Sequence, residues 1–245
     1  MQGTYDVILV GLSYVISVFG AYTGLVLVSQ FRRANDGSSH WLWLTGAAVA
    51  LGGGAIWSMH FIAMLAYKMD MAVSYDIALT LVSLLVAIGV TGLGLFLAHR
   101  DGRLTIGNLL VGGLLMGVGV ASMHYTGMEA MRMEAVMTYD PMMVALSVVI
   151  AIVASIAALW LALTLRGGMQ QFGAALVMGA AVCGMHYTAM LGTRFAHQES
   201  AVSYFSNSFI GGDIASYVAA ATAGILGLAL AAAFGKELSE AREGS

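Results

Sequence analysis

Charged residues are scarce in this chain. Asp, Glu, Lys and Arg make up only 9% of its 245 residues, whereas a soluble domain carries roughly 25%. So few charges cannot cover a water-facing surface, which excludes an ordinary soluble domain. Cysteine occurs once, at Cys183, and this excludes an intrachain disulfide framework and a four-cysteine zinc site. The net charge of −3 indicates no particular partner, and nothing in the sequence suggests a nucleic-acid partner.

The chain has long apolar runs instead. Hydrophobic residues make up 60% of it and form runs of about 18 residues or more, each long enough to cross a bilayer. A single proline beside 31 glycines suits transmembrane helices, because glycine is common where they pack closely. We therefore predict an all-α, polytopic membrane protein whose seven transmembrane helices run from about Val7 to Phe31, Trp41 to Ala66, Ile77 to Ala98, Leu104 to Ala130, Met142 to Leu165, Phe172 to Leu191 and Ile214 to Phe234.

Lysine and arginine are divided unequally between the two ends of these spans. One side has Arg32, Arg33, Arg100, Arg103, Arg166, Lys236 and Arg242, and the other has Lys68, Arg132 and Arg194. The loops on the basic side are short, and the positive-inside rule is reliable for short loops. We expect the N-terminus outside and the C-terminus in the cytoplasm.

A six-residue motif occurs three times, at the end of the second, fourth and sixth runs. It reads MHFIAM at Met59–Met64, MHYTGM at Met123–Met128 and MHYTAM at Met185–Met190. A repeat at a nearly fixed period sets the architecture of a chain. A second repeat, TYD, SYD and TYD, begins the odd-numbered runs at Thr4–Asp6, Ser74–Asp76 and Thr138–Asp140. We predict three tandem two-helix repeats that form a pseudo-threefold six-helix bundle, with a seventh helix added.

Two further positions recur in each repeat. The aspartates Asp6, Asp76 and Asp140 begin helices, where a carboxylate accepts hydrogen bonds from free backbone N–H groups; a role near a metal is the alternative. The glycines Gly53, Gly117 and Gly179 stand seven residues before each motif histidine. Seven residues are two helical turns, so each glycine shares a face with its histidine. We interpret them as positions where helices approach closely.

The motif histidines, His60, His124 and His186, fall at one predicted depth near the outer face. A polar ring inside a membrane is costly without a partner, so such a residue is a functional hypothesis by default. One histidine alone would be interpreted as an interhelical hydrogen bond. Three at the same depth, with the same neighbours, favour ligation of a metal or cofactor.

Methionines accompany each histidine on both sides. Met64, Met128 and Met190 follow at i+4, on the same helical face. Met59, Met123 and Met185 precede at i−1 and point about 100° away, so they are open between ligation and packing. Thioether with imidazole selects soft or borderline ions, copper above all. Zinc and haem are the alternatives, and the number of ions is open.

The neighbours of the motif are less informative. Tyr125 and Tyr187 follow their histidines, but the first copy has Phe61, so the hydroxyl is not required in every unit. Aromatic residues near a membrane interface are commonly anchors. Glu129 has no match in the other copies; a solvated helix end and an outer-shell group are its two interpretations.

At these motifs the chain resembles the MHYT domain family of bacterial membrane sensors. Met123-His124-Tyr125-Thr126 and Met185 to Thr188 spell the four letters, and the first copy departs from them. The resemblance implies a sensory domain of the bacterial inner membrane that binds copper at the motif positions and perceives O2, CO or NO. It also implies a cytoplasmic GGDEF or EAL output domain in cis, which makes or degrades cyclic di-GMP, so that this chain is itself no enzyme.

The domain organisation follows. We expect one sensor domain at residues 1–234 and the start of a cytoplasmic signalling linker at 235–245, because KELSEARE is charged, lacks proline and contains good helix formers. Signalling of this kind usually works through dimers, so a homodimer is an open alternative. Two other functions stay open: a membrane metalloenzyme or redox protein, and a copper transporter. The single depth of the ligands argues against transport.

Overall fold

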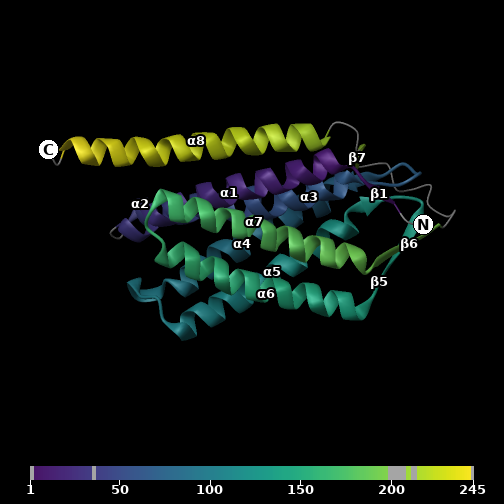
Figure 1. Cartoon of the computed structure of the whole chain (residues 1–245), viewed down its shortest axis with the longest axis horizontal. Coiled ribbons are helices and arrows are strands. Elements are labelled where there is room, and N and C mark those ends of the chain that lie inside the picture. Colours follow the sequence, from purple (N-terminus) through teal and green to yellow (C-terminus); the bar gives the residue numbers. More distant parts are fainter. Residues whose placement is uncertain (1–2, 35–36, 198–207, 211–213, 244–245) are drawn as a thin grey trace.

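The computed structural model describes residues 3–34, 37–197, 208–210 and 214–243 of the chain (Figure 1). Seven of its helical stretches are long and apolar enough to cross a membrane, which confirms the predicted all-α membrane protein. They are α1 (Val7–Arg33), Ser38–Ala66, α4 (Ile77–Ala98), α5 (Ile106–Glu129), α6 (Pro141–Thr164), α7 (Gly168–Leu191) and Val218–Gly235 within α8 (Ile214–Glu243). A 3-10 turn, η2 (Arg100–Gly102), joins α4 to α5.

The second span is built from three helical segments. α2 (Ser38–Ala48) is followed by a π-helix, η1 (Val49–Trp57), and by α3 (Ser58–Ala66). π-helical turns are rare and are often found at functional sites. Of an 18-residue window of this span, 83% is buried, against 28% for α6. The second span is therefore enclosed by other helices, whereas α6 offers most of its apolar surface to lipid.

Short strands, which the sequence did not predict, lie at the end of the bundle that holds the motif copies (Figure 1). Each hairpin begins and ends with a strand, and the two pair antiparallel. β1 (Thr4–Tyr5) pairs with β2 (Tyr67–Lys68), β3 (Ser74–Asp76) with β4 (Met131–Arg132), and β5 (Ala135–Tyr139) with β6 (Thr193–His197). β7 (Ser208–Ile210) adds to the other edge of β3.

The same backbone hydrogen bond closes all three hairpins. The N–H of Asp6 donates to the carbonyl of Ala66, that of Asp76 to Ala130 and that of Asp140 to Gly192, each at 2.8 Å. Each aspartate then caps the helix that follows, because its carboxylate accepts backbone N–H groups of the first turn. The predicted capping role is therefore confirmed. Each TYD or SYD segment thus forms the end of a short strand, and its aspartate caps the helix that follows.

The repeat glycines lie where neighbouring hairpins meet. A Cβ at Gly117 would overlap Ile152 on α6, and one at Gly179 would lie 2.8 Å from Val18 on α1. Gly53 faces Leu84 and Ile88 on α4 at ordinary contact distances. In each case the second helix of one hairpin packs on the first helix of the next, and the third hairpin returns to the first. The six helices therefore close into the predicted pseudo-threefold ring.

The last helix differs from the six that form the ring. α8 packs against α1, η1 and α3 and continues beyond the bundle at the end opposite the strands (Figure 1). Its helical backbone extends to Glu243 without a break at residue 234. The boundary between domain and linker at 234/235 stays a prediction.

Candidate metal centre

The three motif histidines meet inside the bundle. His60 lies on α3, His124 on α5 and His186 on α7, so each hairpin contributes one ring, and all three side chains are buried at 0–1% exposure. The Nδ1 atom of His60 is 3.0 Å from that of His186 and 3.1 Å from that of His124. The ring planes are inclined to one another by 69–79°. The three rings are thus arranged around a common point, with their Nδ1 atoms facing it.

Protons alone cannot satisfy these contacts. A neutral imidazole has one N–H, and each ring nitrogen offers either that proton or one lone pair. The Nδ1 atom of His60 can therefore make only one good hydrogen bond to its two neighbours. A buried polar atom without a partner costs about 1–3 kcal/mol, so three converging nitrogens are unfavourable unless a cation accepts their lone pairs.

The spacing also suits a cation. Nitrogens bound to one ion at about 2.0–2.1 Å, with tetrahedral angles, would be roughly 3.3 Å apart. The observed separations of 3.0 and 3.1 Å are close to this value, and candidate ligand atoms of the three residues all lie within 4.8 Å of one another. The buried triad of His60, His124 and His186 could therefore hold a metal ion.

Packing orients the rings. Metal-binding histidines usually donate their second N–H to an acceptor, but the Nε2 atoms of all three rings are buried without a hydrogen-bond partner among the described residues. The Nε2 atom of His60 faces Gly127 so closely that a Cβ there would overlap it. The position three residues after each motif histidine is small in every copy: Ala63, Gly127 and Ala189. Small residues make room for the rings, and neighbouring side chains hold them.

The six predicted methionines are all buried, but they fall into different surroundings. Met64, Met128 and Met190, the i+4 set, belong to one cluster with Phe61 at the strand end of the bundle. Of the i−1 set, Met123 and Met185 pack in the main apolar core, and Met59 is fully buried. The structure therefore gathers the i+4 sulfurs on one side of the triad. Ligation by any of the six stays a prediction.

More methionines surround that cluster than the motif alone predicts. Met131 and Met133 are buried members of it, and Met69, Met71 and Met137 pack against it. We call the eight residues Met64, Met69, Met71, Met128, Met131, Met133, Met137 and Met190 the methionine cap. Five of them lie in the links after a motif copy, where no helical period marks them. In the sequence, the number of methionines within these short polar links is the feature that could have indicated the cluster.

A buried serine on the first helix of each hairpin, α1, α4 and α6, was also not identified from the sequence. Ser13, Ser83 and Ser147 stand seven residues after the capping aspartates and are fully buried. The hydroxyl of Tyr125 lies 2.9 Å from Ser147, and the Trp57 indole N–H donates to Ser83 at 3.0 Å. The motif tyrosine of the second copy therefore bonds a neighbouring helix. In the first copy, where Phe61 has no hydroxyl, Trp57 makes the corresponding bond.

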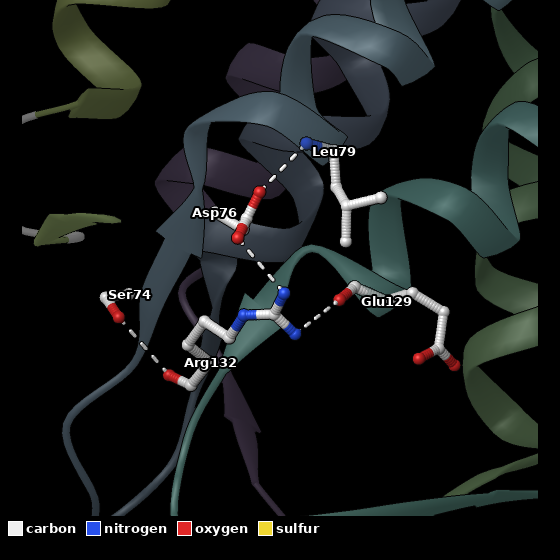
Figure 2. Close-up of polar contacts among 5 residues, drawn as sticks. All are labelled: Ser74, Asp76, Leu79, Glu129 and Arg132. Atoms are coloured by element: carbon white, nitrogen blue, oxygen red, sulfur yellow. Dashed lines mark hydrogen bonds and ion pairs between the residues drawn. The ribbon is translucent and has the colours of Figure 1, made fainter. Parts of the chain in front are cut away.

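The strand end of the second hairpin carries an ion pair (Figure 2). Arg132 Nη2 lies 3.1 Å from Asp76 Oδ2, and Arg132 Nη1 donates to the carbonyl of Glu129. The backbone hydrogen bond from Leu79, followed by the Arg132 guanidinium, lowers the pKa of Asp76 below its ordinary value. The Glu129 carboxylate points away from Arg132 (Figure 2) and accepts from Tyr139 at an exposed site. Glu129 is therefore at a solvated helix end, one of its two predicted interpretations.

The motif repeats agree with a known family. The family described as "MHYT: Bacterial signalling protein N terminal repeat" matches residues 53–112 and 117–175. The chain belongs to the MHYT family. Each match begins at a repeat glycine, Gly53 or Gly117, within the second helix of one hairpin. It then covers the first helix of the next hairpin and ends in the first two turns of the helix that follows. This register matches the contacts between hairpins described above.

Curated relatives match most of the chain. It is 42% identical over 201 residues to the bifunctional diguanylate cyclase/cyclic di-GMP phosphodiesterase MucR of Pseudomonas aeruginosa, covering 78% of this chain and 28% of MucR. It is 36% identical to the cyclic di-GMP phosphodiesterase NbdA of the same species (76% and 24%) and 34% identical to the signaling protein YkoW of Bacillus subtilis (81% and 25%). The MHYT chain thus spans about a quarter of the length of these relatives. No solved structure matches it.

Proposed function

We propose that this MHYT chain is a membrane sensory input domain that binds a metal ion, copper, through the Nδ1 atoms of His60, His124 and His186. It reports a diatomic gas (O2, CO or NO), or the redox or metal state, to a cytoplasmic output that turns over cyclic di-GMP. The observation that carries the proposal is the convergence of three buried Nδ1 atoms, with 3.0 and 3.1 Å contacts, from three different hairpins.

The methionine cap supports copper as the ion. Thioether sulfur binds soft ions such as Cu(I), whereas hard cations prefer oxygen ligands. Met64, Met128 and Met190 supply sulfur one helical turn beyond each histidine. Zinc is the first alternative, because three histidines with an open position are also a zinc site. Haem is the weaker one, since rings with nitrogens 3.0 Å apart leave no space for a porphyrin between them.

An apolar cavity supports a small, uncharged ligand. A cavity of about 40 Å³ lies within the ring of six helices and is lined by Met185, the residue before His186, together with Val120 and Ile56. Apolar cavities of this kind stay dry and accept small apolar molecules. A bound copper ion would supply the affinity for the gas, and the side chains around it would exclude water and larger molecules.

The contacts of α8 support a route for the signal. Ser58, two residues before His60, lies with its hydroxyl 2.9 Å from that of Thr222 on α8. Ile62, two residues after His60, packs with Ala219 on α8. A displacement of α3 would therefore alter its contacts with α8. Sensing requires two states of the bundle with different affinities for the sensed ligand.

The rest of the proposal concerns the whole protein. The names of MucR and NbdA include cyclic di-GMP activities, which we propose for an output domain in cis that follows α8. On this proposal the MHYT chain itself is not an enzyme, and it sits in the bacterial inner membrane with its N-terminus outside. A homodimer is the assembly that such signalling usually requires.

Elemental analysis of the purified chain tests the site. The wild-type chain and the His197→Ala control, which removes an exposed histidine from β6, should retain equal amounts of copper. The single variant His124→Ala and the triple variant at all three histidines should lose it. Equal copper content in all four proteins would refute the site. Zinc or iron in place of copper would refute the choice of ion and leave the triad as its ligand.

A further inference from the structure

A second site lies at the end of the bundle opposite the strands. An open cavity of about 1100 Å³ is found there, comparable in size to the largest pockets that hold small-molecule ligands, roughly 300–1,000 Å³. Six of its lining residues are arginines or histidines: Arg32, Arg33, Arg100, Arg166, His40 and His99. Among the described residues that line it, none is acidic.

Each hairpin of the ring contributes arginine to this cavity. Arg32 and Arg33 end α1, Arg100 follows α4, and Arg166 follows α6. Arginine near helix ends is expected on the basic side of any membrane protein, but such residues normally point outward into solvent. Arg103, in the loop between α4 and α5, is exposed and does not line the cavity. The convergence of the others is therefore a feature of the fold beyond the usual charge bias.

The positive charges lie close to one another. Arg32 is near enough to Arg166 and Arg33 for their charges to repel, and its guanidinium donates to the carbonyl of Leu165 at 3.4 Å, which holds it beside Arg166. The Arg32 and Arg166 guanidinium groups repel each other, and an anion bound between these two would remove that repulsion. A phosphate group suits them, because its oxygens accept two parallel hydrogen bonds from one guanidinium fork.

Two histidines also line this cavity. The rings of His40 and His99 both pack against Phe31, at centroid distances of 4.5 and 5.5 Å. Their Nδ1 atoms are buried without a hydrogen-bond partner among the described residues. Burial and then the positive charge of Arg32 lower the pKa of His99, which favours its neutral ring, and a neutral imidazole still has one N–H to donate. An anion would accept hydrogen bonds from these rings.

An aromatic pair marks one edge of the cavity. Trp41 stacks on Phe96 with ring centroids 5.7 Å apart and planes inclined by 25°. Phe96 lines the cavity, and both rings are exposed, Trp41 by 56% and Phe96 by 39%. Exposed aromatic rings at the ends of spans sit at the level of lipid headgroups. The cavity is thus placed where lipid phosphates and soluble phosphates can both reach it.

We propose that this cavity binds the phosphate group of an anionic ligand, supplied either by a phospholipid headgroup or by a soluble phosphate compound. The arginines of the three hairpins hold the phosphate oxygens, and His40 and His99 add donors at the inner wall. Because the ligand would touch the ends of α1, α4 and α6 together, it would hold the three hairpins at a fixed spacing at this end.

Binding to the purified, delipidated chain in a neutral detergent tests the proposal. One arm titrates phosphatidylglycerol, with phosphatidylcholine as the uncharged reference, and counts bound lipid by native mass spectrometry. The other titrates sodium pyrophosphate and follows the melting temperature, which rises when a ligand binds the folded chain. Tighter binding of phosphatidylglycerol than phosphatidylcholine identifies a lipid site, and a shift with pyrophosphate identifies a soluble ligand.

Variants separate the cavity from general charge attraction. Arg166 is exposed, so Arg166→Gln should fold normally by circular dichroism and gel filtration, and should bind about tenfold more weakly because one charge-assisted pair is lost. The affinity of Arg166→Lys for the phosphate probes should lie between those of the wild type and Arg166→Gln. Arg103→Gln removes the same charge outside the cavity and should bind like the wild type. Equal weakening by both Gln variants, or no preference for either phosphate probe, would overturn the proposal.

Discussion

Individual residues around the triad have roles that the motif letters do not reveal. Gly127 contacts the Nε2 edge of His60, and Tyr125 reaches Ser147 on α6. Neither points to direct ligation of an ion. Both instead fix where the histidine-bearing helices stand, so the motif combines the histidines of the triad with residues that position them. The two roles can be separated by single substitutions.

Gly127→Ala tests the packing of the triad. The new Cβ overlaps His60 Nε2, so His60 must turn away from His124 and His186, and we expect metal content and thermal stability both to fall. Gly184→Ala on α7 is the matched control, since a Cβ there meets nothing within 4 Å, and alanine is the better helix former by about 0.8–1 kcal/mol. Metal analysis and thermal unfolding of both variants make the measurement. Equal behaviour of the two would argue against a crowded site.

Tyr125→Phe tests the role of the motif tyrosine. Loss of the 2.9 Å contact with Ser147 should destabilise the bundle by about 0.6 kcal/mol, the average for a hydrogen bond between membrane helices. Metal content should not change, because the first copy already has Phe61 at this position. Unfolding in a detergent titration measures the first effect and elemental analysis the second. A variant that lost its metal would instead make the hydroxyl part of the centre.

At the scale of the elements, the second span is the unusual one. Its π-helix, η1 (Val49–Trp57), ends three residues before His60, and a Cβ at Gly54 within it would lie 2.8 Å from Leu226 of α8. The span therefore joins the triad to the last helix through contacts on both sides of the histidine. α5 and α7 carry their histidines on regular α-helices.

A double-mutant cycle tests this connection. Ser58→Ala and Thr222→Ala each remove one hydroxyl of the 2.9 Å pair, so we expect a coupling of about 0.5–1 kcal/mol between them in the free energy of unfolding. Thr164 bonds within its own helix to the Trp160 carbonyl, so the cycle of Ser58→Ala with Thr164→Ala should give no coupling. Zero coupling in the first cycle would remove this contact from the signal route.

At the scale of the whole molecule, the triad of His60, His124 and His186 joins the three hairpins, because each hairpin contributes one of its histidines. A ligand that binds only the folded state stabilises it by mass action, by about 4.1 kcal/mol at a thousandfold excess over its Kd. Treatment of the wild-type chain with a copper chelator should therefore lower its melting temperature by several degrees. The triple histidine variant should melt at the same temperature with and without chelator, and a drop in that protein would mean that the stabilising ion sits elsewhere.

Much of this arrangement could be predicted from the sequence. Apolar runs located all seven spans to within a few residues, because few charges interrupt them, and the repeated aspartates and histidines gave the threefold relation. The convergence of the rings through Nδ1 could not be predicted, since spacing along a helix fixes depth but leaves the ring nitrogen open. Strands of two residues such as β2 (Tyr67–Lys68) are too short for an alternating pattern, and the composition of η1 does not distinguish a π-helix from an α-helix.

α8 packs against elements of the first hairpin, and this has a consequence for which substitutions would change the signal of such a sensor. Each hairpin contributes one histidine to the triad, but α3 is the histidine-bearing helix that adjoins α8. α3 thus contacts α8 as well as the ring, and the second hairpin reaches beyond the ring only by the pairing of β3 with β7 among the contacts described above. On the proposed function, we expect substitutions on α3 to change the signal as well as ligand binding, and substitutions on α5 and α7 to change mainly ligand binding.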